Sequence, residues 1–190
     1  ENSSVPVVSL MIDRSGSMDD DPAEDPDSDV DWRLDKVKAM FHKFILDLPE
    51  GSLLQVGSFA EPEGGTDPCY DQITTDRKAA ALQGLGSLVA GGGTPTRTAL
   101  ELAYRNLSTV PSKKRVLVFF TDAAIAGGDD EAEIMLIHEM LGNLKKSGVR
   151  VLIAGLLNSK NAGDYEAGFR ALNYVRKPAN WILLLWRCHP

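Results

Sequence analysis

VPVVSLMIDRSGS, residues 5–17, is the most informative segment of the sequence. Its first eight residues are almost all apolar, and they predict a buried β-strand over residues 5–12. Asp13, Ser15 and Ser17 follow at alternate positions, where the chain leaves that strand. One carboxylate and two hydroxyl groups so close together offer the oxygen ligands that hard cations such as Mg²⁺, Mn²⁺ and Ca²⁺ prefer.

Two later segments supply groups of the same kind. GGGTPT, residues 91–96, places Thr94 after three glycines, and VLVFFTD, residues 116–122, is a second apolar run that ends in Asp122. Thr94 is also typical of a helix N-cap, with Pro95 at the first helical position. A single D-x-S-x-S is a weak signal because Ser and Asp are common in turns, but three such segments in this order are a specific one.

Together the three segments resemble the metal-ion-dependent adhesion site (MIDAS) of von Willebrand factor A (vWA) domains. The resemblance implies that a divalent cation, Mg²⁺ in the first place and Mn²⁺ or Ca²⁺ as alternatives, is held by Asp13, Ser15, Ser17, Thr94 and Asp122. It also implies that the serines bind the cation directly and the aspartates partly through water. One coordination position then remains for an Asp or Glu of a partner protein.

Strand-like and helix-like segments alternate along the chain. Apolar runs predict strands at residues 5–12, 53–59, 115–121, 149–157 and 181–186, with a short edge strand at 71–75. Helices are predicted at residues 32–48, 76–88, 96–107, 130–147 and 165–172, with Asp76 as an N-cap. This order indicates an α/β fold, a Rossmann-like, doubly wound, mostly parallel sheet with helices on both faces. Asp13 and Asp122 would both lie at the carboxyl ends of strands, where such folds bind ligands.

Four methionines stand at apolar positions of these segments and are expected in the core: Met11, Met40, Met135 and Met140. Two cysteines, Cys69 and Cys188, could form one disulfide or remain two separate thiols, and both alternatives stay open.

Length and composition indicate one soluble globular domain. The resemblance implies that it is a single vWA-like domain over residues 1–190. The chain is 43% hydrophobic and 25% charged, which is ordinary for a globular protein. No apolar run approaches the about 20 residues that span a bilayer, so we expect no membrane insertion. Lys and Arg are scattered along the sequence, so we expect no nucleic-acid partner.

An acidic insertion follows the first motif, at about residues 19–31. It contains eight acids and no base, and the formal net charge of −7 becomes +1 when these eight acids are set aside. A solvated acidic loop is the favoured interpretation. An auxiliary Ca²⁺ site and a loop that selects basic partners are the alternatives. An EF-hand does not fit, because Val30 and Lys36 stand where that motif needs Gly and Glu.

We expect a metal-dependent protein-binding or adhesion module, not an enzyme, at an extracellular or cell-surface location. One alternative is a vWA subunit or scaffold of an intracellular ATP-driven complex, although the chain has no nucleotide-binding G-x-x-x-x-G-K-[ST] loop of its own. The less favoured alternative is an aspartate-based phosphoryl-transfer enzyme. Phosphatases of the haloacid-dehalogenase type need a second Asp where Ser15 stands, and a receiver domain needs a Lys that residues 151–155 lack.

Overall fold

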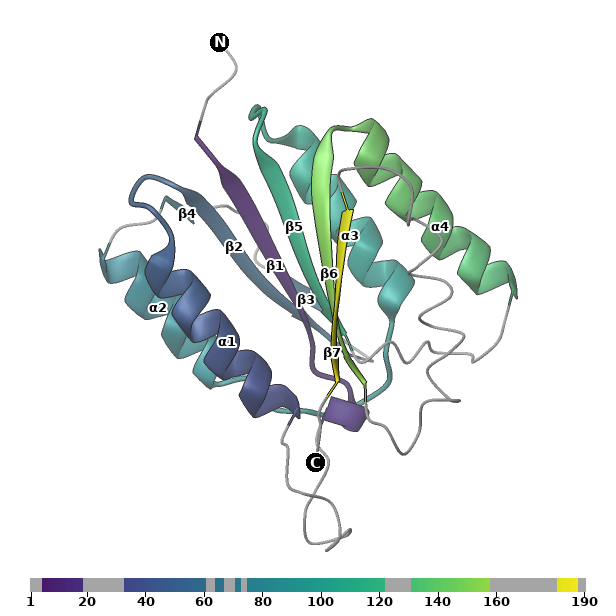
Figure 1. Cartoon of the computed structure of the whole chain (residues 1–190), viewed down its shortest axis with the longest axis horizontal. Coiled ribbons are helices and arrows are strands. Elements are labelled where there is room, and N and C mark those ends of the chain that lie inside the picture. Colours follow the sequence, from purple (N-terminus) through teal and green to yellow (C-terminus); the bar gives the residue numbers. More distant parts are fainter. Residues whose placement is uncertain are drawn as a thin grey trace, which may run out of the picture.

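The computed structural model describes residues 5–18, 33–60, 64–66, 71–72, 75–121, 131–157 and 181–187. In chain order the elements are β1 (Val7–Asp13), the 3₁₀ helix η1 (Gly16–Met18), α1 (Arg33–Asp47), β2 (Leu53–Phe59), β3 (Gly64–Thr66), β4 (Asp71–Gln72), α2 (Thr75–Gly86), α3 (Thr96–Thr109), β5 (Arg115–Thr121), α4 (Glu131–Lys146), β6 (Val149–Leu157) and β7 (Trp181–Arg187) (Figure 1).

The described strands form one sheet in the order β3-β2-β1-β5-β6-β7, with β4 also paired to β2. β1 is parallel to β2 and β5, and β6 is parallel to β5 and β7, whereas β3 and β4 run antiparallel to β2. Asp13 stands opposite Phe59 of β2, and Ile12 stands opposite Phe120 of β5. The carboxyl ends of β1, β2 and β5 are therefore level at one edge of the sheet. The chain passes from β1 to β2 on one side of β1, and β5 later pairs with the other side. Open α/β sheets bind ligands beyond the carboxyl ends of the strands where the strand order reverses in this way.

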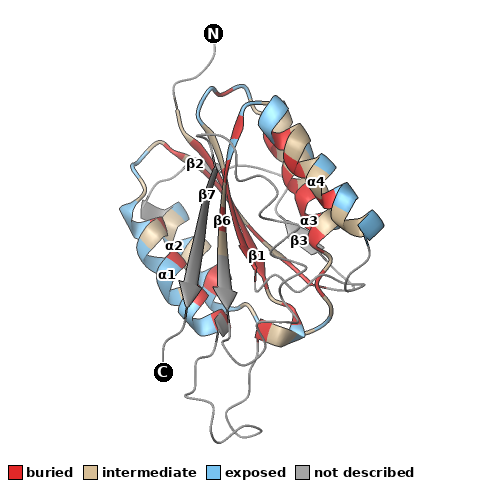
Figure 2. Cartoon of the chain, turned by 45° about the vertical axis from the view of Figure 1, so that its right-hand side comes forward, coloured by how far each residue is buried: buried red, intermediate tan, exposed pale blue. Residues whose placement is uncertain are grey.

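The core has two layers, one on each face of the sheet. Along β1, Val8, Leu10 and Ile12 pack with α1 and α2, while Val7 and Met11 pack with α3 and α4. All seven residues of β1 are buried, as expected for a central parallel strand that is covered on both faces. Figure 2 shows this burial along the sheet and on the inward sides of the helices. The predicted doubly wound, mostly parallel α/β fold is thus confirmed.

Aromatic pairs pack beneath the carboxyl edge of the sheet on both faces. Phe59 and Phe119 stack with ring centroids 5.0 Å apart. On the opposite face, Phe41 and Phe120 meet edge to face at 5.8 Å. Both separations lie in the favourable range for aromatic rings, so the ends of β2 and β5 rest on closely packed layers.

The predicted element bounds agree with the structure to within about two residues for most elements. β4 is shorter than the predicted edge strand, and β3 was not predicted, because Gly64-Gly65-Thr66 carries no apolar pattern and depends on pairing with the end of β2. α2 begins at Thr75, so Asp76 lies within its first turn and is not the N-cap. The predicted helix at 165–172, the acidic insertion, Cys69 and Cys188 lie outside the described residues.

The prediction that four methionines lie in the core is wrong for two of them. Met11 is fully buried, but Met40 and Met135 are 38% and 70% exposed. Both lie on amphipathic helices. The buried stripe of each helix includes fewer residues than the helix has apolar side chains, so these two methionines lie outside it. Among the described helices, none is both long enough and apolar enough to cross a bilayer.

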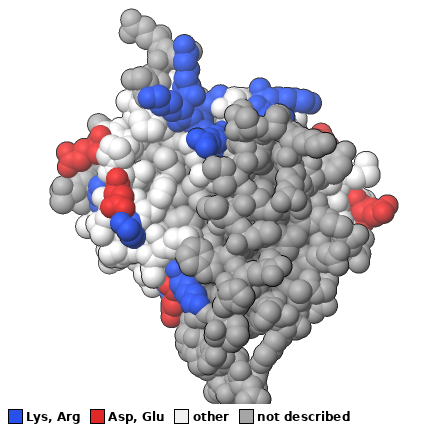
Figure 3. All heavy atoms as spheres, viewed as in Figure 1, with Lys and Arg blue, Asp and Glu red and all other residues white. Residues whose placement is uncertain are grey.

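Cations that are scattered in the sequence gather in space at the amino end of the sheet. Figure 3 shows Lys and Arg side chains grouped at the upper end of the molecule. The exposed residues at this end come from the segment just before β5, the last turn of α4 and the start of β6: Lys113, Lys114, Lys145, Lys146 and Arg150. Lysines in the last turn of a helix interact favourably with its partial negative charge.

Candidate metal centre at the carboxyl edge of the sheet

Asp13, the last residue of β1, is held by hydrogen bonds at both carboxylate oxygens. The backbone N–H of Ser15 donates to Oδ1 at 2.9 Å, and the hydroxyl of Thr121 donates to Oδ2 at 2.7 Å. The first bond is the local turn that Asp commonly makes with the second following residue. The second bond crosses to the end of β5. Because Asp13 and Thr121 are both fully buried, the carboxylate has a fixed orientation.

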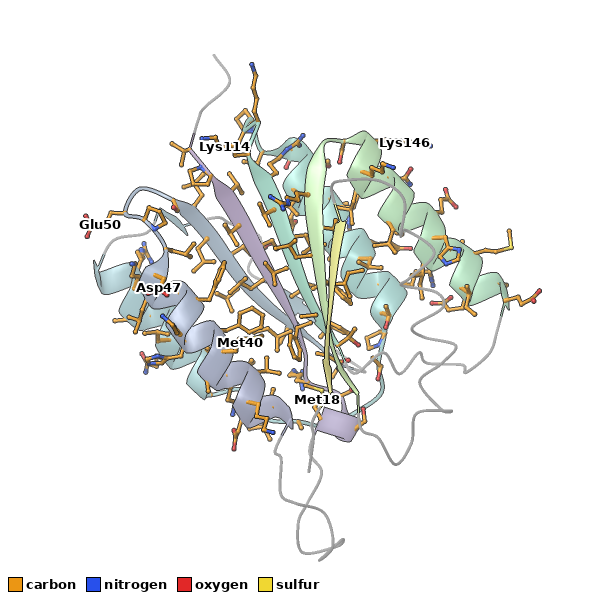
Figure 4. The ribbon with its side chains drawn as sticks, viewed as in Figure 1. Met18, Met40, Asp47, Glu50, Lys114 and Lys146 are labelled. Atoms are coloured by element: carbon orange, nitrogen blue, oxygen red, sulfur yellow. The ribbon has the colours of Figure 1, made fainter. Side chains whose placement is uncertain are left out.

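Ser15 and Ser17 bring two hydroxyl groups together directly after Asp13. Their Oγ atoms lie 3.1 Å apart, with Ser15 buried and Ser17 partly exposed. η1 is closed by a 2.9 Å hydrogen bond from the N–H of Met18 to the carbonyl of Ser15. The Met18 side chain is fully buried in the α1/α2 layer of the core and anchors this turn at the lower end of the sheet (Figure 4). We refer to residues 13–18 as the serine turn.

Backbone hydrogen bonds join the serine turn to the glycine loop, residues 91–95. The N–H of Gly16 donates to the carbonyl of Gly92, and the N–H of Gly91 donates to the carbonyl of Arg14, both at 2.8 Å. The N–H of Arg14 donates to the carbonyl of Phe59 at the end of β2, at 3.0 Å. Gly92 has φ +79°, a conformation that glycine adopts without strain. The two motifs therefore lie side by side although about 75 residues separate them.

The structure corrects the predicted role of Thr94 as a helix N-cap. Pro95 occupies the N-cap position of α3, and no side chain makes a capping hydrogen bond there. The carbonyl of Thr94 accepts the N–H of Thr96 at 2.8 Å. Thr94 and Thr96 are both buried, and among the described residues the Thr96 hydroxyl oxygen has no hydrogen-bond partner. The first turn of α3 thus brings polar groups to the glycine loop that do not serve to cap the helix.

Four of the five predicted metal ligands lie in the described part of the chain, and Asp122 lies outside it. Asp13, Ser15 and Ser17 form one hydrogen-bonded group. Thr94 follows two residues after Gly92, which the serine turn contacts directly. Within the described ranges no three His, Cys, Asp or Glu side chains form a metal cluster. Hydroxyl groups are therefore the main described donors at this edge.

Thr121 is a residue of this site that the sequence interpretation missed. The T-D pattern contained it, but only Asp122 was assigned a role. The sequence contained a signal for this contact, because two parallel strands were expected to end at the same edge. Parallel pairing places the last residue of β5 beside the last residue of β1. Ile12 pairs with Phe120, and Thr121 follows at the level of Asp13.

An ion-pair network joins the helices that follow the site. Arg97, in the first turn of α3, donates from Nε to both carboxylate oxygens of Glu133, at 3.3 and 3.2 Å, and from Nη1 to Glu101 at 2.8 Å. Glu133 lies in the first turn of α4. The pKa of Arg97 is raised above its ordinary value by the charge of Glu133 and, second, by that of Glu101. The network connects the start of α3 to the start of α4.

Comparisons with known proteins identify a family and several solved structures that resemble this chain. The family model described as von Willebrand factor type A domain matches residues 8–125. Among curated proteins, no sequence match is found. A solved structure described as von Willebrand factor type A from Catenulispora acidiphila has 21% identity and a TM-score of 0.71, and the match covers 98% of this chain and 39% of that one.

Two further solved structures share the fold. An aerotolerance-related membrane protein from Bacteroides fragilis NCTC 9343 has 20% identity and a TM-score of 0.62, with 95% of this chain and 91% of that chain covered. Proximal thread matrix protein 1 from the mussel byssus, described with a zinc-occupied MIDAS motif, has 16% identity and a TM-score of 0.58, with 83% and 39% covered. Since the family model matches more than half of the sequence, the chain belongs to the von Willebrand factor type A domain family, whose members commonly mediate protein–protein interactions.

Proposed function

We propose that this domain is a metal-dependent protein-binding module. Five residues would hold a divalent cation at the carboxyl edge of the sheet: Asp13, Ser15, Ser17, Thr94 and Asp122. An Asp or Glu side chain of a partner protein would complete the coordination. The observation that carries the proposal is the pair of serine hydroxyls placed beside a fully buried carboxylate.

The spacing of the two hydroxyls fits a small octahedral cation. Adjacent ligands of Mg²⁺, at about 2.1 Å from the metal and at right angles, are separated by about 3 Å. The Oγ atoms of Ser15 and Ser17 lie 3.1 Å apart, which is compatible with Mg²⁺ as the proposed cation, with Mn²⁺ and Ca²⁺ as alternatives.

Asp13 would supply negative charge to the proposed site. It is fully buried, and the N–H of Ser15 and the hydroxyl of Thr121 donate to its two oxygens. Ser15 and Ser17 would supply neutral oxygens beside it. A bound cation would supply a Lewis-acid site for an anionic oxygen of the partner.

We further propose that the domain is not an enzyme and that it works outside the cell or at its surface. Ser15 occupies the position of a second catalytic Asp, and β6 contains no Lys. The mussel byssus protein among the structures of the same fold is in keeping with such a location. Assays with p-nitrophenyl phosphate should show no turnover above background, and turnover that disappears in Asp13→Asn would contradict the proposal.

Cation binding is tested by thermal unfolding of the wild type and of the double variant Ser15→Ala/Ser17→Ala. A ligand at a hundredfold excess over its Kd stabilises the native state by about 2.7 kcal/mol. We expect Mg²⁺ or Mn²⁺ to raise the Tm of the wild type and to leave the double variant nearly unchanged. Ser87→Ala is the matched control, because its exposed hydroxyl donates only to the carbonyl of Gly84 in the described structure. An equal rise in all three proteins would reject the site.

Recognition of an acidic group is tested with a peptide array in which each central Asp or Glu has an amide counterpart. The acidic peptides should bind in Mg²⁺ and be released by chelator, because the open coordination position requires an anionic oxygen. Binding that is indifferent to both the amide exchange and the chelator would place recognition on another surface.

A further inference from the structure

We propose that Thr121 is a positioning residue of this metal site, and that its hydroxyl holds Asp13 in the orientation that cation binding requires. The inference rests on the proposed function. The observation behind it is the 2.7 Å hydrogen bond from Thr121 Oγ1 to Asp13 Oδ2, between two side chains that are both fully buried.

Two separate segments fix the carboxylate of Asp13. Ser15, on the serine turn, donates its N–H to Oδ1, and Thr121, at the end of β5, donates its hydroxyl to Oδ2. A carboxylate held at one oxygen can still turn about its Cβ–Cγ bond. Donors on both oxygens, approaching from different strands, remove that rotation. Thr121 therefore links the direction of the Asp13 carboxylate to the parallel pairing of β1 and β5.

The direction of the hydrogen bond sets the role of Thr121. An ionised carboxylate only accepts hydrogen bonds, so the single hydroxyl proton of Thr121 points to Asp13. In this arrangement the Thr121 side chain acts through Asp13. Removing a group that hydrogen-bonds to a metal ligand and orients it commonly lowers metal affinity 10- to 100-fold. We expect a loss of this size when the hydroxyl of Thr121 is removed.

Three substitutions separate this role from a general effect on stability. Thr121→Val keeps the shape of the side chain and removes the donor, whereas Thr121→Ser keeps the donor. Ser9→Ala is the matched control. Ser9, on the same strand as Asp13, donates a buried hydrogen bond to Gln55 Oε1 of β2 at 2.9 Å. Ser9→Ala therefore also removes a buried hydrogen bond from a hydroxyl group to the adjacent strand. This bond lies four residues before Asp13 in β1.

The experiment is calorimetric titration of the full 190-residue chain with Mn²⁺ and with Mg²⁺, at a temperature where every variant is folded in chelator. Thr121→Val should bind at least 10-fold more weakly than the wild type. Thr121→Ser should bind within about threefold of the wild type, and so should Ser9→Ala. If Thr121→Val does not fold, Thr121→Ala replaces it and should show the same loss.

Two results would overturn the inference while the proposed function stands. In the first, the wild type binds and Thr121→Val binds equally well. In the second, Ser9→Ala loses as much affinity as Thr121→Val, which would show that any lost strand contact has this effect. A wild type that binds neither cation would reject the proposed function, and the role of Thr121 with it.

Discussion

The two ends of the parallel sheet use their polar side chains in different ways. At the amino end, side chains bind the carbonyl groups that helices leave without partners at their carboxyl ends. Arg115 donates to the carbonyls of Leu107 and Ser108 in the last turn of α3, at 2.9 and 3.4 Å, and to that of Ser147 after α4. Lys78 donates to carbonyls at the end of α1, those of Leu46 and Leu48. In Figure 4, Lys114 and Lys146 mark this end and Met18 marks the other.

The carboxyl end of the sheet gathers polar side chains at the serine turn and at the start of α3. α3 starts there with no side-chain cap, and among the described residues the hydroxyl of Thr96 has no partner. Asp13 carries a buried carboxylate beside two serine hydroxyls. Side chains at the amino end therefore complete helix-terminal hydrogen bonds and support stability. The other end keeps oxygen donors that suit a bound cation, and such departures from local optimisation are expected at functional sites.

The largest effect is expected from Arg115→Met. This variant removes the donors to three helix-terminal carbonyls, and hydrogen bonds of charged groups are worth about 1.5–3 kcal/mol each before relaxation. We expect the free energy of unfolding to fall by about 3 kcal/mol in urea denaturation, with cation affinity unchanged. Lys114→Met, at the exposed neighbouring position, should change stability by no more than about 0.5 kcal/mol. A change in cation affinity in Arg115→Met would show that the two ends are not independent.

Two glycines with nearly equal φ angles, one at each end of the sheet, extend the comparison to the backbone. Gly92 has φ +79° at the carboxyl end, and Gly148 has φ +80° at the amino end. Alanine at either position should cost about 1–2 kcal/mol of stability in chelator, because a side chain is strained in this conformation. A Cβ at Gly148 would also lie 3.4 Å from Arg115 Nη2.

Only Gly92→Ala should weaken cation binding, because the carbonyl of Gly92 accepts the N–H of Gly16 and keeps the glycine loop against the serine turn. Stability is measured by denaturation in chelator, and affinity by titration with Mn²⁺. Equal affinities in the two variants would mean that the geometry of the glycine loop is not needed for the site.

The smallest effect is expected for the ion pair between Arg97 and Glu133. Their side chains are 38% and 25% exposed, and partly exposed pairs are worth up to about 1 kcal/mol. A double-mutant cycle with Arg97→Gln and Glu133→Gln should give a coupling of about 0.5 kcal/mol that falls as salt is added. Lys43 and Asp47, exposed on one helix, form the control pair and should couple less. A coupling that salt does not reduce would indicate a contact other than the ion pair.

The sequence predicted most of the sheet, for a physical reason. β5 and β6 occupy the predicted ranges, because strands that are buried on both faces are continuous apolar runs bounded by polar residues. β3 could not be predicted in the same way, because its glycines carry no pattern and its pairing with Gly57–Phe59 is a tertiary contact. The family assignment depended on three short motifs, and the match over residues 8–125 confirms it.

The candidate site was predictable in its residue types but not in its connections. Asp13, Ser15 and Ser17 lie together, as their spacing suggested. The bond from Thr121 depends on the level at which β5 ends beside β1, and the absence of a side-chain cap on α3 depends on the local path at Pro95. Neither can be read from a motif. The five-residue ligand set remains a prediction.

Arg14 shows how such a site could diversify during evolution. Its N–H binds the carbonyl of Phe59, and its carbonyl accepts the N–H of Gly91, so these two contacts depend on the main chain alone. Every residue except proline, which lacks the N–H, preserves them. Position 14 is partly exposed and stands between Asp13 and Ser15. Substitutions there would change the charge and shape presented to a partner while the neighbouring oxygen groups stay in place, so recognition could diverge among relatives without rebuilding the site.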